Sequence, residues 1–428
     1  MKIAIVGGGM TGLSAAYFLS RQHSVTLFER EETLGGLASC FQAGGWQWPL
    51  ERYFHHFFTS DRQLLRLVKE LGIEKKLIFR KPKTSIFIDG QIFHFDSPQS
   101  ILSFPKLGMA DKIRLGLVSA LLKINPFWQP LENITAISFI KKTMGEKVFA
   151  LVWQPLFESK FGTFAEQIPA SWFWTRIQKR SFALGYFEGG TEVLIRALAE
   201  KISKNGGRIV VGKEIKQVRK DNQKFEVFFN KQKWPENFDR VIFTTSPQSV
   251  LKLYPHLTEK EKKQLAKLKS LGSLCLVLAL KKTFLTKGTY WLNINNQRFP
   301  FVAVVEHTNF ISPKHYANQH LLYVGGYYPA KHHYFSLNKK EVLAEFLPYL
   351  KKIKAEFDFK QNLLGSWLFK DSYAQPIISL NYSKQILPVL LSTSGLYWTS
   401  LHHVYPQDRG VNYAIKLGKR LADEIKKS

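Results

Sequence analysis

The sequence predicts an α/β fold, in which a domain built on a parallel sheet is interleaved with a second domain of α+β type. Residues 2–6 form a short apolar run that is typical of a buried parallel strand, and residues 239–245 form another far along the chain. The second run indicates that the chain returns to its first sheet. Other patterns predict a separate sheet with a helix beside it: a hairpin at 85–94, strands at 273–280, 301–306 and 320–328, and a helix at 339–352.

A glycine-rich turn directly follows the first strand. Residues 7–12 read Gly-Gly-Gly-Met-Thr-Gly, which is the G-x-G-x-x-G pattern of dinucleotide-binding turns. Gly7 allows the tight turn, Gly9 lets the backbone approach a pyrophosphate, and Gly12 lets the following helix pack close to the strand. That helix, predicted over 13–21, points free N–H groups at the phosphates. The residues expected to bind the cofactor here are Gly7, Gly9, Met10, Thr11 and Gly12.

An acidic residue ends the second predicted strand, residues 24–29. Glu29 lies about twenty positions beyond the glycine turn, where an acid can bind the ribose hydroxyls of the adenosine half. Glycines that only shape a turn would not require this acid. The strand, turn, helix and acid together therefore predict a Rossmann-like dinucleotide site.

A pair of glycines indicates which dinucleotide is bound. Glu29-Arg30 is followed, after four residues, by Gly35-Gly36-Leu37, and the two glycines remove side chains where a second segment must lie close to the pyrophosphate. The motif resembles the second dinucleotide signature of a large flavoprotein family that includes amine oxidases, protoporphyrinogen oxidases and phytoene desaturases. This resemblance implies that the cofactor is FAD and that Arg30, Gly35, Gly36 and Leu37 help to hold it.

The resemblance covers nearly the whole chain and implies a division into two domains. Residues 185–190 resemble the glycine-rich segment at which protoporphyrinogen-oxidase-like members return from the substrate domain. In that family the next strand and its partner touch the adenine, which implies that Ile215 lies at the adenine edge. We expect the FAD-binding domain to comprise 1–55, 185–250 and 391–428, and the substrate-binding domain to comprise 56–184 and 251–390.

The last predicted strand and helix, 396–400 and 411–426, match the family's final flavin-contacting segment, which implies contacts from Gly410 and Val411. The N-terminus of that helix would stabilise negative charge on the reduced flavin. Family members usually carry Gly-Asp at the strand end, where Ser400-Leu401 stands here. Asp408 is expected to replace that acid at the ribityl chain, unless the backbone alone holds the chain; an ion pair or a helix cap is the other interpretation.

Residues 51–61 are expected to carry the substrate chemistry. They resemble the Tyr-x-x-His-x-Phe stretch of UDP-galactopyranose mutases, in which the histidine lies against the isoalloxazine, and His56 is the matching position. This implies a catalytic role for His56 in orienting the flavin or moving a proton, and a substrate contact for Tyr53. An aromatic-rich core turn is the alternative. The mutase resemblance weakens near the end of the chain, where Ser400 occupies the position of a diphosphate-binding arginine.

Residues 171–180 combine wide aromatic rings with cations. If this segment lines the cavity, Arg176 and Arg180 contact the substrate, and an elongated apolar or planar molecule with an acidic head would fit. An amphipathic helix with a buried aromatic face also explains the pattern.

The chain carries a formal net charge of +28, which favours anionic partners. Its lysines are scattered and no nucleic-acid module occurs, so we expect no nucleic acid partner. Residues 110–123 have the basic, amphipathic character of an interfacial helix, with Ile113, Leu117 and Leu121 on the apolar side. This predicts peripheral contact with an anionic membrane, although packing onto its own domain explains the same stripe.

Composition suits a cytoplasmic globular protein. Of 428 residues, 45% are hydrophobic, and the two cysteines provide no disulfide framework. The first strand begins at residue 2, so we expect no signal peptide, and no apolar run approaches the length of a membrane span. The predicted location is therefore the cytoplasm, with the membrane surface as a peripheral site.

The sequence predicts an FAD-dependent oxidoreductase of oxidase or desaturase type, in which a hydrophobic or porphyrin-like substrate gives hydride to flavin N5. Because no second glycine fingerprint follows a strand, oxygen or a quinone is the expected electron acceptor, and no metal-binding motif is present. Two alternatives remain open. One is a mutase-like flavoenzyme acting on a sugar nucleotide, and the other is a flavin-bound lipid- or carrier-binding protein without turnover.

Overall fold

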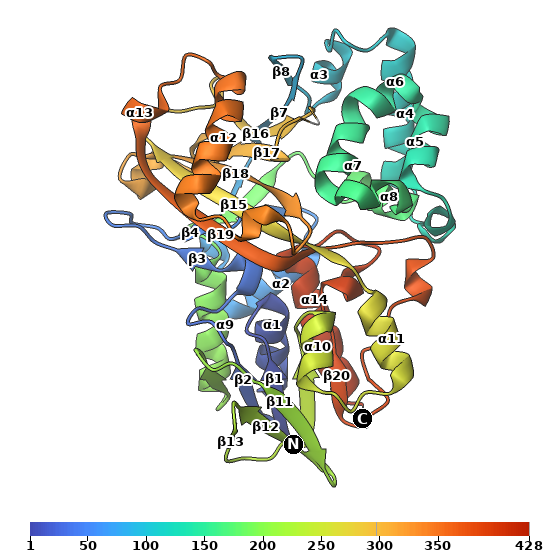
Figure 1. The fold of residues 1–428 in the computed structure, drawn as a ribbon, viewed down its shortest axis with the longest axis vertical. Helices are drawn as coiled ribbons and strands as arrows, with labels where there is room; N and C mark the ends of the chain where they lie inside the picture. Colours follow the sequence, from blue (N-terminus) through green and yellow to red (C-terminus); the bar gives the residue numbers. More distant parts are fainter. Residues whose placement is uncertain (297, 428) are drawn as a thin grey trace.

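The computed structural model describes residues 1–296 and 298–427, and two large sheets dominate it (Figure 1). The parallel sheet and its helices form the lower part of the molecule in Figure 1, where both termini lie. A mixed sheet forms the upper part, and a group of helices stands beside it. This architecture confirms the predicted α/β class with a parallel sheet.

The lower sheet takes its five parallel strands from three separate stretches of the chain, in the order β10-β2-β1-β14-β20. The second apolar run does return to the first strand, with Ile5 paired to Ile242. All five strands fall inside the segments predicted for the FAD-binding domain, whose boundaries stay a prediction. The strands are β1 Lys2–Val6, β2 Ser24–Phe28, β10 Arg208–Val210, β14 Arg240–Phe243 and β20 Leu396–Trp398.

Helix α1 (Met10–Leu19) is buried on nearly every side. It packs between α9 (Glu192–Lys204) and α14 (Val411–Ile425) and against the sheet, which explains why its sequence is apolar all round. At the contact with α14, a Cβ on Gly418 would lie 2.7 Å from the backbone N of Ala15. Glycine therefore permits the close approach of the two helices.

The upper sheet is mixed and has seven strands in the order β19-β15-β18-β17-β16-β7-β8. Strands β7 and β8 form the predicted hairpin, in which Asp89 and Gly90 both have positive φ. Helix α12 (Lys339–Ile353) contacts β15 and β19. The sheet comprises β7 Lys83–Ile88, β8 Gln91–His94, β15 Ser270–Leu280, β16 Thr289–Ile294, β17 Ala303–Glu306, β18 His320–Tyr328 and β19 Leu363–Pro376.

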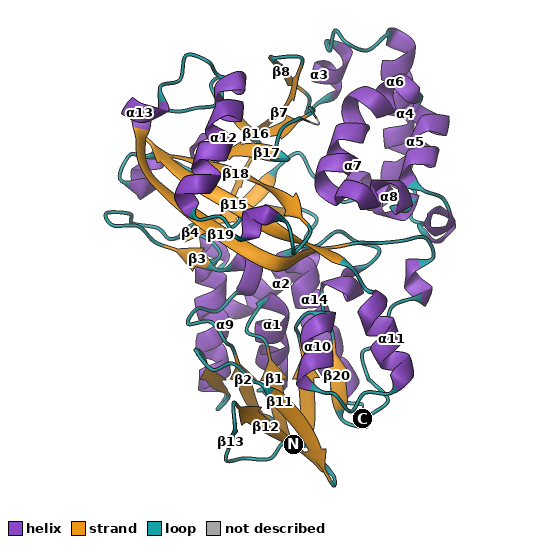
Figure 2. Cartoon of the chain, in the orientation of Figure 1, coloured by secondary structure: helices purple, strands orange, loops and turns teal. Residues whose placement is uncertain are grey.

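The helical group lies beside the upper sheet, where Figure 2 shows helices packed on one another. Its core includes the buried rings of Phe157, Phe161 and Trp172. The group comprises α3 Pro98–Leu102, α4 Met109–Ile124, α5 Ala136–Met144, α6 Glu146–Val148, α7 Gln154–Phe161 and α8 Ala170–Gln178.

A small sheet, β5-β9-β6, joins the segment that leaves the FAD-binding domain to the segment that returns. A Cβ on Gly185 would lie 2.0 Å from the ring of Phe57, so this crossing requires glycine.

The remaining elements are β3 Cys40–Phe41, β4 Leu50–Glu51, β5 Phe57–Phe58, β6 Leu77–Arg80, β9 Leu184–Phe187, β11 Gln217–Asp221, β12 Lys224–Phe229, β13 Gln232–Lys233, α2 Arg62–Leu71, α10 Pro247–Leu253, α11 Glu259–Lys267 and α13 Phe359–Asn362. Within the described residues, no helix has the length and apolarity needed to span a bilayer.

Candidate functional site

A cavity of about 1960 Å³ runs between the lower sheet, the upper sheet and the helical group. Pockets for a single small ligand measure about 300–1,000 Å³, so this space has room for a cofactor and a second molecule. The structure brings together every site residue predicted from the sequence except Gly12. The predicted residues that line the cavity are Gly7, Gly9, Met10, Thr11, Glu29, Arg30, Gly35, Gly36, Leu37, Tyr53, His56, Arg176, Arg180, Ile215, Asp408, Gly410 and Val411.

The two glycine motifs form one cradle at the edge of the lower sheet. Gly9 and Gly35 lie side by side as a parallel bridge, and the N–H of Gly35 donates to the carbonyl of Gly8 at 2.9 Å. A Cβ built on Gly9 would have one neighbouring atom within 4 Å, the Cα of Gly36 at 4.0 Å. Gly9 lines the cavity, so its backbone is not covered by protein side chains there. The bare backbone is therefore accessible to a ligand, as the pyrophosphate of a dinucleotide requires.

Gly12 serves packing instead of ligand contact. A Cβ at this position would lie 1.9 Å from the carbonyl oxygen of Gly7, which leaves no room for any side chain. Gly7 itself has a φ of 113°, a conformation that favours glycine. The turn at Gly7 and the close packing at Gly12 match the conformational roles that the sequence predicted, Gly12 does not line the cavity, and the pyrophosphate contact of Gly9 stays a prediction.

The start of α1 is free to bind an anion. Gly9 is its N-cap, and among the described residues no side chain caps the helix and no acid stands in its first turn. Amides in such a position bind phosphate well. Glu29 lies beside them, where its two carboxylate oxygens accept the N–H groups of Gly8 at 2.6 Å and Glu31 at 2.9 Å. A carboxylate has further lone pairs, so Glu29 can also accept ribose hydroxyls. The residues present therefore fit FAD.

Asp408 lies on the cavity wall in an ion pair, with its Oδ2 3.1 Å from Nζ of Lys160 on α7. Burial raises the pKa of Asp408, but the charges of Lys160, Arg409 and Arg176 outweigh burial and lower it to about 2. Burial lowers the pKa of Lys160 to about 7 although Asp408 opposes the change. This geometry favours the ion-pair interpretation of Asp408, and its contact with the ribityl chain stays a prediction.

Arg409 reaches the cavity beside the start of α14. Its guanidinium donates to the hydroxyl of Tyr327 on β18 and lies 4.8 Å from the centre of that ring. Its Nε is buried and has no hydrogen-bond partner among the described residues. A buried unpaired donor is costly, so this N–H is available to a ligand in the cavity.

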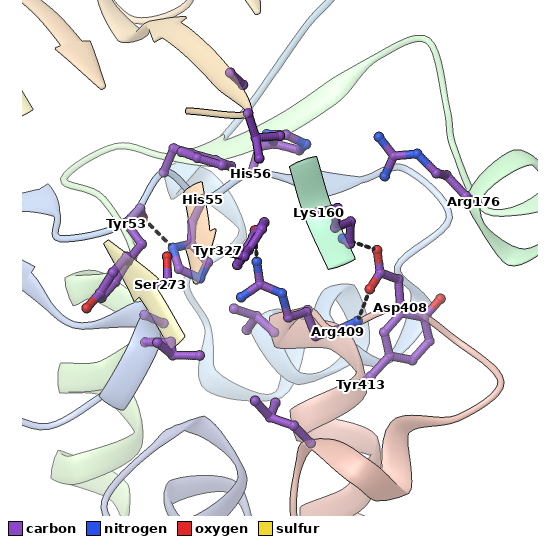
Figure 3. Close-up of a pocket in the computed structure, with 18 of the residues that line it drawn as sticks. Tyr53, His55, His56, Lys160, Arg176, Ser273, Tyr327, Asp408, Arg409 and Tyr413 are labelled. Atoms are coloured by element: carbon purple, nitrogen blue, oxygen red, sulfur yellow. Dashed lines mark hydrogen bonds and ion pairs between the residues drawn. The ribbon is translucent and has the colours of Figure 1, made fainter. Parts of the chain in front are cut away.

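Tyr53, His55 and His56 lie on the opposite side of the cavity from Lys160 and Asp408 (Figure 3). The Nδ1 of His55 is 2.6 Å from the carbonyl oxygen of Tyr53, and because a carbonyl only accepts, Nδ1 carries the proton. The Nδ1 of His56 is 3.3 Å from the hydroxyl of Tyr290. Burial, followed by the charge of Arg180, lowers the pKa of His56 to about 3, so its ring is neutral at pH 7. The catalytic role of His56 stays a prediction.

The aromatic rings of α8 do not lie where a cavity-lining segment would place them. Trp172, Phe173 and Trp174 are buried in the core of the helical group and do not line the cavity. The rings were expected to contribute to the pocket if this segment lined it; instead they form the buried face of an amphipathic helix. Arg176 and Arg180 do line the cavity, so the segment supplies its cations and not its rings.

Several site residues were not found from the sequence. Lys160, Tyr290 and Tyr327 line the cavity but belong to no sequence motif. In the folded chain Lys160 lies beside Asp408, Tyr290 lies beside His56, and Tyr327 lies beside Arg409. Glu51 is fully buried, where it accepts the Tyr186 hydroxyl at 2.6 Å and the Thr191 N–H at 2.7 Å. The only local indication of this buried hydrogen-bond acceptor was the position of an acidic residue just before the aromatic segment.

Comparisons with known proteins show which family the chain resembles and which fold it shares. A family model of flavin-containing amine oxidoreductases matches residues 10–426. The 15-cis-phytoene desaturase of Synechococcus elongatus is 25% identical over 256 residues, which cover 53% of this chain and 53% of the desaturase. Protoporphyrinogen oxidase 1 of Spinacia oleracea is 28% identical over 163 residues, covering 36% of this chain and 28% of the oxidase. The chain thus spans less than two thirds of the length of these curated relatives.

A solved structure of reduced UDP-galactopyranose mutase is similar over the whole chain. It has a TM-score of 0.77 and 16% identity, and the match covers 100% of this chain and 95% of the mutase. At this identity the likeness shows a shared fold. Together these matches confirm the resemblance to the amine-oxidase-like flavoproteins that the glycine motifs indicated.

Proposed function

The chain belongs to the family of flavin-containing amine oxidoreductases, and its cofactor is FAD; on this basis we propose that it oxidises an apolar or planar substrate that carries an acidic group. The observation that carries the proposal is the single cavity that joins the glycine cradle to a chamber lined by apolar side chains and cations. Such a chamber suits an amphiphilic organic molecule.

The cradle and its neighbours would hold FAD. Gly9, Gly35 and the first amides of α1 fit the pyrophosphate, and Glu29 fits the ribose. The uncapped start of α14, at Gly410 and Val411, fits the pyrimidine edge of the flavin. When bound, FAD would supply a hydride acceptor at N5, and oxygen or a quinone is the proposed acceptor of its electrons.

The protein's own groups position the substrate and exclude water. His56 is neutral and held near Tyr290, so one ring nitrogen can orient a neighbouring group or accept a proton. Tyr53 is half-buried in the same wall and limits the space beside His55. The arrangement of these side chains around the cavity aligns the donor carbon of the substrate.

We also propose that the protein contacts an anionic membrane through α4. Ile113, Leu117 and Leu121 are 53%, 61% and 62% exposed, so the protein's own domain does not cover this apolar stripe. Exposed apolar side chains of this size, next to Lys112 and Arg114, suit the interface of an anionic bilayer. Ile113 and Leu117 also line the cavity, which would then open toward the lipid.

A second candidate is a mutase-like flavoenzyme that acts on a sugar nucleotide. The fold likeness to UDP-galactopyranose mutase supports it, together with the paired cations Arg176 and Arg180, which suit a diphosphate. Such an enzyme would need a flavin that is already reduced and would consume no net electrons.

Anaerobic reduction of the flavin separates these functions. The purified yellow protein is mixed without oxygen with porphyrinogens, polyprenoids, amines and nucleotide sugars in turn, and the flavin absorbance near 450 nm is followed, a wavelength set by the flavin itself. An oxidoreductase is bleached by its substrate alone. A mutase is not bleached but converts a nucleotide sugar after chemical reduction. Binding without bleaching or conversion would contradict both functions and favour a binding protein without turnover.

A further inference from the structure

Two arginines stand unpaired at the end of α8. Arg176 and Arg180 are four positions apart, both line the cavity, and Figure 3 shows the guanidinium of Arg176 directed into it. Among residues 1–296 and 298–427 neither guanidinium makes a hydrogen bond or an ion pair, and Arg176 only rests near the ring of Trp172, at 5.7 Å. Arginine presents five donors in a fork that matches an oxyanion.

The surroundings of this pair are strongly positive. The charge of Arg176, and then burial, lower the pKa of Arg180 to about 9. Lys160, Lys179 and Arg409 line the same cavity, and the carboxylate of Asp408, which acts on both arginines, is already paired with Lys160. The two like charges repel each other, and a carboxylate shared with Lys160 offsets only part of this repulsion. An anion between them would remove this cost.

An apolar route leads from these arginines to the outside. Leu102, Ile113, Leu117 and Phe182 line the cavity and are also exposed at the surface of the helical group. Ile177, one residue after Arg176, also lines the cavity. The cavity therefore presents exposed apolar side chains and unpaired cations within one continuous space, which suits an amphiphile with an anionic head.

We propose that Arg176 and Arg180 form a subsite for the oxyanion head, a carboxylate or a phosphate, of an amphiphilic substrate whose apolar part lies along α4. The inference rests on the proposed function and deepens it.

Direct binding to the FAD-loaded protein tests this arrangement with three probes. Dodecyl phosphate carries both an anionic head and an apolar tail, dodecanol carries only the tail, and inorganic phosphate carries only the head. Each probe is titrated calorimetrically, dodecyl phosphate below its micelle concentration and dodecanol below its solubility limit. Dodecyl phosphate should bind at least tenfold more tightly than either of the others. Equal affinity for dodecanol would show that no anion subsite exists, and equal affinity for inorganic phosphate would show that the tail has no site.

Variants assign the parts of the subsite. Arg176→Met and Arg180→Met should each weaken dodecyl phosphate at least tenfold, as the loss of a charge-assisted hydrogen bond predicts, and should leave dodecanol unchanged. Leu117→Ser should weaken dodecyl phosphate and dodecanol but not inorganic phosphate. Arg66→Met is the control, because Arg66 is exposed on α2 away from the cavity. Unchanged binding of dodecyl phosphate by both arginine variants would overturn the proposal.

Flavin content separates failure of this subsite from failure of the proposed function. The arginine variants should keep the FAD absorbance of the wild type, because the cradle lies at α1 and not at α8. If binding is lost together with FAD, the arginines hold the cofactor and the subsite is refuted. If the wild type binds dodecyl phosphate as described but no substrate bleaches its flavin, the subsite stands and the oxidoreductase function fails.

Discussion

Lys160 and Asp408 form an ion pair, with Nζ 3.1 Å from Oδ2, that joins α7 of the helical group to the loop before α14. The two residues are 248 positions apart. Only 8% of the lysine side chain and 24% of the aspartate side chain are exposed, so solvent screens the pair weakly. The contact therefore fixes the helical group against the FAD-binding part of the molecule at the cavity wall.

Removing one partner of this pair should destabilise the protein. Lys160→Met leaves a largely buried carboxylate whose remaining neighbours are Arg409 and Arg176, and we expect a loss of about 2–3 kcal/mol in the free energy of unfolding. Urea denaturation monitored by tryptophan fluorescence measures it. Lys262→Met, which breaks an exposed pair with Glu259, should cost no more than about 1 kcal/mol. Similar losses in the two variants would mean that the Lys160 pair is no stronger than a surface pair.

Gly9→Val should abolish tight FAD binding without unfolding the protein. The new side chain would occupy the open side of the cradle, where little of the protein lies within reach. We expect FAD affinity to fall by at least about tenfold, equivalent to 1.4 kcal/mol. The ratio of flavin absorbance to protein in the purified sample, before and after addition of FAD, measures the effect.

Two other glycines provide controls for that variant. Gly44→Val should keep FAD, because a Cβ on Gly44 meets nothing within 4 Å and the residue lies outside the cavity. Gly12→Ala should instead lower the thermal stability, because its Cβ would lie 1.9 Å from the Gly7 carbonyl. A Gly9→Val protein with full FAD content would refute the position of the pyrophosphate.

The glycine cradle was predictable because its chemistry is local. Gly7, Gly9 and Gly12 lie within six residues; a positive φ requires glycine at position 7 and a close approach requires it at position 12, whereas Gly9 was predicted from its place in the motif. Nothing local identifies Lys160, which stands in a helix of weak amphipathic character and meets Asp408 only in the folded chain. The cofactor site therefore follows from the sequence, whereas the charge network around it depends on the fold.

Strand β19 illustrates the other limit of sequence reasoning. Its fourteen residues include Gly365, Ser366, Lys370 and Asp371, and most of them are only partly buried. The apolar alternation that marks a half-buried strand is therefore weak. Pairing with the almost fully buried β15 holds this segment in the sheet, so a tertiary contact decides its structure.

His56 should stay neutral across the physiological pH range. Its folded-state pKa of about 3 lies below the ordinary value of 6.5 because of burial and then the charge of Arg180. The unfolded chain therefore binds more protons between pH 6.5 and 3, and the contribution of His56 to stability is complete above pH 6.5 and is lost as the pH falls toward 3. NMR titration of ring-labelled histidine should show no inflection for His56 between pH 5 and 8.

A variant identifies the histidine in that titration. His56→Gln removes its resonance and should also reduce the pH dependence of stability below pH 6.5, because one neutral buried imidazole is gone. A wild-type resonance that titrates near pH 6.5 and disappears in His56→Gln would contradict the burial of this ring.

The α4 stripe should bind anionic vesicles. Wild-type protein is expected to sediment with vesicles that contain phosphatidylglycerol, less so with pure phosphatidylcholine, and less at high salt, because both apolar and charged contacts contribute. Leu117→Glu places a charge in the stripe and should reduce binding at least about tenfold. Leu364→Glu, at an exposed leucine on β19, should leave it unchanged. Equal sedimentation of these two variants would exclude α4 as the contact surface.

The strand order of the lower sheet also has a consequence for folding kinetics. Because β14 lies beside β1 and β20 completes the edge, the sheet is assembled from segments that are far apart in the chain. Helix α14, which covers α1 and presents its first turn to the cavity, adds a further contact of this kind. Contacts between distant segments require long loops to close first, so we expect this sheet to form slowly compared with structure held by local contacts.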